Sequence, residues 1–76
     1  MSMTDQTINE IKQTALTAYA SALAWTQDDP GIGTPEERAA NMAADDMMYQ
    51  LGMSEYAEFQ KRIGGADVAP WLLKVG

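Results

Sequence analysis

The sequence predicts an all-α fold, a small three-helix bundle with a short fourth C-terminal helix or tail. Three observations predict it. Apolar residues recur at three- and four-residue spacing in the first third of the chain, as on one face of a helix. A complete helix-start signature, Thr34-Pro35-Glu36-Glu37, follows a break that contains Pro and Gly. No segment alternates apolar and polar residues as a half-buried strand does. The 76 residues suffice for one domain, so residues 1–76 are taken as a single acidic helical domain.

The first helix is expected from about Thr4 to Gln27. Thr7 and Glu10 fit a capping box, and Thr4 offers an alternative cap one turn earlier. The helix should end before Asp28-Asp29-Pro30-Gly31, because Asp opposes the helix dipole at a C-terminus and Pro cannot continue a helix. Its inward face is expected to carry Ile8, Ile11, Ala15, Ala18, Tyr19, Ala22 and Trp25, widened by Leu16 and Leu23.

The second helix has the clearest start in the sequence. Thr34 is the expected N-cap and Pro35 the first helical residue, and the two Glu residues that follow lie at the favourable end of the dipole. Gly52 is expected as the left-handed residue that ends this helix. The inward face should carry Ala40, Ala43, Ala44, Met47 and Leu51.

Two short elements should follow. Ser54 is the expected N-cap of a third helix that carries Tyr56, Phe59 and Ile63 and stops at Gly64-Gly65. Asp67 is then expected to cap a last short helix with Val68, Trp71 and Leu72, and an extended tail is the alternative. Trp71, Leu72 and Leu73 either close the core or form a short anchor that inserts into a partner.

The composition excludes several function classes. Without cysteine or histidine, the chain has no disulfide, thiolate nucleophile, Cys/His zinc site or imidazole acid–base catalyst. The adjacent pairs Asp28-Asp29 and Asp45-Asp46 do not match a calcium-loop spacing. We therefore expect no metal, no cofactor and no enzymatic activity. The N-terminus lacks the basic and apolar regions of a secretory signal, and the longest uncharged run, residues 13–27, is too short to span a bilayer, so a cytoplasmic location is expected.

The charge is concentrated in the middle of the chain. The net charge is −6 overall, and residues 28–58 alone carry −7, whereas residues 59–76 carry +2. Direct binding to nucleic acid or to an anionic membrane is therefore disfavoured. Residues 28–58 form an acidic block. This block is either a solvated surface that keeps the protein soluble or an acidic face that docks on a basic surface of a larger protein.

A helical wheel of the second helix places an apolar spot inside this acidic block. With Ala40 and Met47 facing inward, Met42 and Tyr49 point outward on one line. A flexible thioether and an amphipathic ring among carboxylates are typical of a binding hot spot. The alternative is that the C-terminal element covers both side chains. The candidate partner-binding residues are Arg38, Met42, Asp45, Asp46 and Tyr49, with Glu36, Glu37, Asp28 and Asp29 as outlying charges.

The outer face of the first helix has a second unusual feature. It carries four small, uncharged residues where an exposed helix normally carries Lys, Glu or Arg. Small residues let another helix approach closely, so this face indicates either a helix packed on both sides or a homodimer seam. The seam residues are Thr17, Ala20, Ser21 and Ala24.

Two resemblances bear on function. Gly52-Met53-Ser54 at a helix start, in a short acidic helical chain, resembles the acyl and peptidyl carrier proteins, whose serine carries phosphopantetheine. In that family an Asp precedes the serine and an apolar residue follows it, whereas here Met53 precedes Ser54 and Glu55 follows. In size, charge and fold class, though in no residue motif, the chain is also similar to the small acidic proteins, anti-CRISPR proteins among them, with which bacteriophages disable host machines.

These observations predict a non-catalytic interaction protein of the inhibitor or regulator type. The expected partner is a larger protein with a basic surface, such as one that otherwise holds nucleic acid, and the protein would act by covering that surface. The alternative is a homodimeric structural or accessory subunit that uses the small-residue face of the first helix. The carrier-protein interpretation rests on Ser54 alone.

Overall fold

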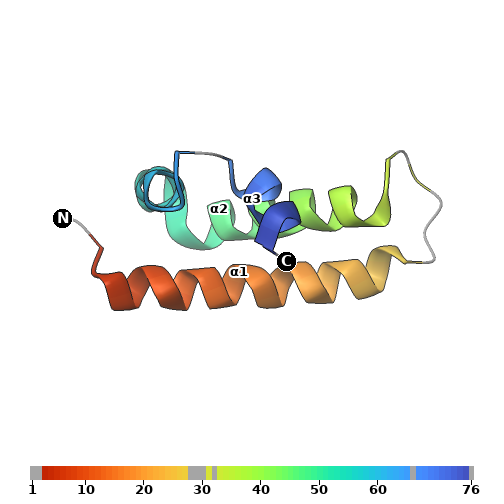
Figure 1. The fold of residues 1–76 in the computed structure, drawn as a ribbon, viewed down its shortest axis with the longest axis horizontal. Helices are drawn as coiled ribbons and strands as arrows, with labels where there is room; N and C mark the ends of the chain where they lie inside the picture. The colour runs from red at the N-terminus through yellow and green to blue at the C-terminus, as the bar shows by residue number, and fades with distance from the viewer. Residues whose placement is uncertain (1–2, 28–30, 32, 66, 76) are drawn as a thin grey trace.

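The computed structural model describes residues 3–27, 31, 33–65 and 67–75, and they form three α-helices. α1 spans Asp5–Thr26, α2 spans Pro35–Arg62 and α3 spans Val68–Val75. The described residues contain no strand, so the predicted all-α bundle is confirmed. The two helices predicted over residues 34–51 and 54–63 are the two halves of α2, and α3 is the predicted short C-terminal helix. Figure 1 shows α1 and the first half of α2 side by side and antiparallel, and α3 packs against both.

The caps fix where the two long helices begin. Thr4, not Thr7, caps α1, since the Thr4 hydroxyl oxygen accepts a hydrogen bond from the Thr7 amide at 3.1 Å. The earlier of the two predicted caps is therefore the correct one. Thr34 caps α2 as predicted, and its hydroxyl oxygen accepts from the Glu37 amide, also at 3.1 Å. Each bond satisfies one of the amides that a helix start leaves without an intrahelical partner.

Gly52 divides α2 into two halves that meet at a kink. Its φ of 80° and ψ of 165° lie in a region that is essentially restricted to glycine. The predicted positive φ is confirmed, and the helix resumes directly after it. The second half consequently turns away from the axis of the first, and Figure 1 shows it nearly end-on. Ser54 thus lies in the first turn after this break, on the exposed side of α2.

Six of the fourteen buried apolar residues in the described part of the chain are alanines, and larger side chains complete the core. α3 closes it, because Val68 and Leu72 are fully buried and Trp71 packs edge-on against Phe59 with 5.9 Å between ring centroids. This decides between the two roles considered for the C-terminal residues, since only Leu73 of the three is exposed. The buried apolar residues are Ile8, Ile11, Ala15, Tyr19, Ala22, Ala39, Ala40, Ala43, Ala44, Met47, Tyr56, Phe59, Val68 and Leu72.

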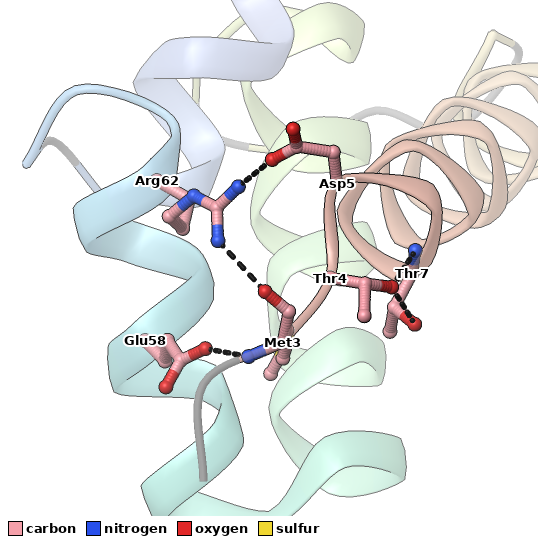
Figure 2. A network of polar contacts seen from close by, with 6 residues as sticks. All are labelled: Met3, Thr4, Asp5, Thr7, Glu58 and Arg62. Carbon is pink, nitrogen blue, oxygen red and sulfur yellow. Dashed lines mark hydrogen bonds and ion pairs between the residues drawn. The ribbon is translucent and has the colours of Figure 1, made fainter.

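A polar network ties the start of α1 to the second half of α2 (Figure 2). Arg62 donates to the Met3 carbonyl oxygen at 2.9 Å and pairs with the Asp5 carboxylate, while Glu58 accepts from the Met3 amide. The network holds the half of α2 that follows Gly52 against the N-terminal residues. It thereby fixes the direction that the second half takes after the break.

At the other end of α1, two side chains join α1 to the start of α2. The Thr26 hydroxyl lies 3.2 Å from the carbonyl oxygens of both Leu23 and Pro35. The guanidinium of Arg38 donates to the Thr26 carbonyl oxygen at 3.1 Å, and it lies so close to Gly31 that a Cβ there would overlap it. These contacts hold α1 and α2 at a fixed spacing where the chain reverses direction.

Candidate functional site

An open groove of about 690 Å³ runs between α1 and the first half of α2. The lining residues of the groove recur at a spacing of four positions in both helices, and this spacing places their side chains on one flank of each helix. No residue of α3 contributes to it. The lining residues are Gln13, Thr14, Thr17, Ala18, Ser21, Ala22 and Trp25 from α1, with Met42, Ala43, Asp46 and Gln50 from α2.

Trp25 lies at one end of the groove, and its predicted place in the core is wrong. The Trp25 side chain is 83% exposed, whereas the neighbouring Thr26 is only 4% exposed. Thr26 can be buried because its hydroxyl lies within hydrogen-bond distance of two backbone carbonyl oxygens. These contacts offset the free-energy cost of removing the hydroxyl from water. The inward stripe of α1 therefore passes from Ala22 to Thr26 and leaves the indole outside. Ala18, also predicted inward, is half-buried and lines the groove.

The predicted hot spot on α2 is exposed. Met42 is 50% exposed and Tyr49 is 92% exposed, so the alternative in which the C-terminal element covers them is wrong. Met42 and Asp46 line the groove. Tyr49 and Asp45 are exposed outside the lining, on the solvent side of the same helix. The helix thus presents one carboxylate inside the groove and one beside it.

The remaining candidate residues of the acidic block lie elsewhere. Glu36 and Glu37 are exposed in the first turn of α2, beyond the end of the groove. Arg38 is half-buried at the junction of the two long helices, where it donates to the Thr26 carbonyl oxygen. Asp28 and Asp29 lie outside the described residues. The structure therefore brings together Met42 and Asp46 with residues of α1 and leaves the other charges at a distance from them.

The predicted seam on α1 meets the predicted hot spot on α2. Thr17 and Ser21 line the groove opposite Met42 and Asp46, and Ala20 and Ala24 are exposed on the adjoining face of α1. The two surfaces that the sequence suggested separately are thus one continuous surface. The groove residues that the sequence reasoning missed are Gln13, Thr14, Gln50 and Trp25. The four-residue spacing of Gln13, Thr17, Ser21 and Trp25 is the signal that could have identified them.

The groove offers shape, apolar contact and hydrogen bonding. Its polar groups are hydroxyls, side-chain amides and the Asp46 carboxylate, with no cation in the lining. Among the described residues, no group of three acidic side chains gathers where a metal ion could bind. Ser54 is exposed and lines a separate depression with Glu58, Lys61 and Arg62. The groove residues therefore supply apolar contacts, hydrogen-bonding groups and one carboxylate.

The surroundings of Tyr56 in the core favour its protonated phenol. Burial raises the pKa of the Tyr56 phenol above its usual value of 10.0, and the charges of Asp67 and Asp45 raise it further. The folded protein thus keeps this proton at a pH where the unfolded chain has lost it. The resulting stabilisation is complete below about pH 10 and is lost as the pH rises through the folded-state pKa.

We therefore expect Tyr56→Phe to reduce the alkaline loss of stability. Urea denaturation at about pH 8 and about pH 11 measures that loss as the difference between two free energies of unfolding. The difference should be smaller for the variant than for the unaltered protein. Equal differences in the two proteins would contradict the assignment to Tyr56.

No helix in the described part of the chain is both long and apolar enough to cross a membrane. Comparisons with protein-family models, with curated proteins and with solved structures each find no significant match to this chain.

Proposed function

We propose that this chain is a non-catalytic binding protein that inhibits or regulates a larger protein by covering a basic surface on it. The observation that carries the proposal is the exposure of two aromatic side chains beside an open groove. Trp25 and Tyr49 are 83% and 92% exposed, although burying each would remove a large apolar area from water. Exposed aromatic and Met side chains grouped on one surface are typical of interaction sites.

The charge around the groove supports a basic partner. Asp45, Asp46, Glu36 and Glu37 are all exposed on the first half of α2, within the block of residues 28–58 that carries a net charge of −7. Such a field accelerates association with a positively charged surface and makes it sensitive to salt, while apolar anchors slow dissociation. In size, charge and fold class the chain is similar to small phage-encoded inhibitors such as anti-CRISPR proteins.

The test is an affinity pull-down from cell lysate at low and at high salt, with mass spectrometry of the retained proteins. We expect one large basic partner that elutes when salt is raised. The double variant Asp45→Lys with Asp46→Lys should retain none of it. Glu55→Lys is a control, because Glu55 is exposed on the second half of α2, away from the groove, and it should retain the partner. Retention that does not change with salt would contradict the proposal.

A separate prediction concerns Tyr49. Because its side chain is 92% exposed, Tyr49→Ala should leave the melting temperature within about 2 °C of the unaltered protein. Binding to the partner should weaken at least about tenfold, since an exposed aromatic anchor beside the groove would be lost. Calorimetry and a titration with the retained partner measure the two effects. A large fall in melting temperature would instead give Tyr49 a structural role.

The second candidate function is a homodimeric accessory subunit. It is favoured by the exposure of all four predicted seam residues, Thr17, Ala20, Ser21 and Ala24, none of which carries a charge. In that case Ala20→Glu or Ala24→Glu would abolish self-association, because two carboxylates would face each other in the seam. Analytical ultracentrifugation of the unaltered protein and of both variants distinguishes the two functions. A monomer at all concentrations would exclude the dimer.

A further inference from the structure

The pair formed by α1 and the first half of α2 has two flanks, and the protein covers one of them. On one flank Leu16 and Leu23 are half-buried against the core, and α3 contacts both long helices. The groove lies on the flank defined by Thr17 and Ser21, and nothing from α3 reaches it. A helical pair with one flank filled by a helix and one flank open can accept a further helix on the open side.

The open flank is long enough for a helix of several turns. A second depression lined by Gln6, Asn9 and Glu10 shares Gln13 and Thr14 with the groove and extends it toward the start of α1. From Gln6 to Trp25 the surface follows 20 residues of α1, whose 19 steps of 1.5 Å give a length of about 28 Å. An occupying helix of about the same number of residues would contact the whole surface.

The chemistry of this surface varies along its length. The end near Trp25 is apolar, with Ala22 and Met42 beside the indole. Toward the other end stand two carboxylates, Asp46 and Glu10, and the linings of the two depressions contain no Lys or Arg. Asp46 accepts a hydrogen bond from the Gln50 amide at 3.0 Å and Glu10 accepts one from the Gln6 amide at 3.4 Å. Neutral amides leave the negative charge of both groups available to a cation.

The same charges disfavour a second copy of this chain as the occupant. Each copy carries a net charge of −6, and two such surfaces brought together would oppose like charges. A helix with cationic side chains complements the surface. It requires an apolar stripe for the Trp25 end and Lys or Arg placed to reach Asp46 and Glu10.

We propose that the groove between α1 and α2 receives one basic amphipathic helix of the partner protein. The apolar stripe of that helix packs on Trp25, Met42 and Ala18, and its Lys or Arg side chains pair with Asp46 and Glu10. Thr17 and Ser21 are small, so the incoming helix approaches α1 closely. This inference rests on the proposed function and specifies which element of the basic partner makes contact.

The test uses a synthetic 19-residue helical peptide of Leu, Ala and Lys with one apolar face, labelled for fluorescence anisotropy. Two control peptides are the same composition in scrambled order, which has no apolar face, and a version with Glu in place of Lys. Two protein variants add the same residue to the same helix. Ser21→Arg places it in the groove, whereas Ala20→Arg places it on the exposed face outside the groove.

We expect the amphipathic basic peptide to bind, the scrambled peptide to bind at least about tenfold more weakly and the acidic peptide not to bind. Ser21→Arg should weaken binding at least about tenfold, and Ala20→Arg less than about threefold. The two variants have the same net charge, so a difference between them reports where the added Arg lies. In NMR spectra of the labelled protein, the amide signals of Thr17, Ser21, Asp46 and Gln50 should shift on addition of the peptide.

Three results would overturn the inference. They are no binding of the amphipathic peptide, equal binding of the scrambled peptide, and equal losses in the two Arg variants. The pull-down can still show salt-sensitive capture of a partner while the peptide shifts NMR signals only of residues outside the groove. In that case the proposed function survives and the helix-in-groove inference fails. If Asp45→Lys with Asp46→Lys leaves capture unchanged, the proposed function itself fails. Self-association that Ser21→Arg abolishes and Ala20→Arg preserves would place a second copy in the groove.

Discussion

Phe59→Ala is expected to lower the free energy of unfolding by about 3–5 kcal/mol. Phe59 is fully buried in the second half of α2, and its ring packs against Trp71 of α3. Truncation to alanine removes the transfer free energy of the ring and leaves a cavity, because the surrounding core relaxes only in part. A 76-residue domain has a total stability of only about 4–11 kcal/mol, so much of the margin is lost.

Urea denaturation followed by circular dichroism measures this effect. Met53→Ala is the matched control, because Met53 lies in the same half of α2 but is exposed, and its truncation should cost less than about 0.5 kcal/mol. Phe59→Leu keeps most of the buried volume and gives a measurable transition if the alanine variant does not fold. Equal effects of Phe59→Ala and Met53→Ala would show that the side of α2 facing α3 is not the core.

Gly52→Ala should have the next largest effect, a loss of about 1–3 kcal/mol. The backbone at Gly52 has φ 80° and ψ 165°, where an L residue is strained by its own Cβ. No neighbouring atom lies within 4 Å of the position that this Cβ would take. The expected loss therefore comes from the backbone conformation alone and not from a steric clash.

Chemical synthesis of the chain allows a strict control for this prediction. D-alanine at position 52 adds the same methyl group, but for a D residue the conformation mirrors an extended one that is allowed. The D-alanine protein should be at least as stable as the unaltered protein, because the unfolded chain loses conformational freedom. Thermal unfolding of the three proteins gives the comparison. A similar loss for the L and D forms would contradict the backbone explanation.

Local sequence signals predicted most of the fold, because caps and glycines act on their immediate neighbours. Thr34 begins α2 and Gly52 interrupts it, both as expected from turn and cap chemistry. The inward stripe of α2 followed from its spacing, and Ala40, Ala43, Ala44 and Met47 are buried. The prediction treated the segments on each side of Gly52 as separate helices, since a sequence does not show that the chain resumes its helix at once.

The groove could not be predicted in the same way, because it depends on how two helices face each other. The wheel of α2 predicted the exposure of Met42 and Tyr49, but not that Thr17 and Ser21 would stand opposite Met42. Trp25 was misplaced for a different reason. Apolar character alone favours burying the indole, whereas the junction with α2 supplies carbonyl oxygens that allow Thr26 to be buried instead.

The alanine-rich contact between α1 and α2 has a consequence for how this protein tolerates sequence change. Alanine loses no rotamer freedom on burial, so the contact forms at low entropic cost, but it leaves no spare volume around Ala15, Ala39, Ala40 and Ala43. In a leucine-rich core the damaging substitutions are those that shrink a side chain. Here enlarging one forces the helices apart, which also alters the groove that Ala43 helps to line. Sequence change at these interior positions is therefore confined to small residues, and the same restriction preserves the shape of the groove.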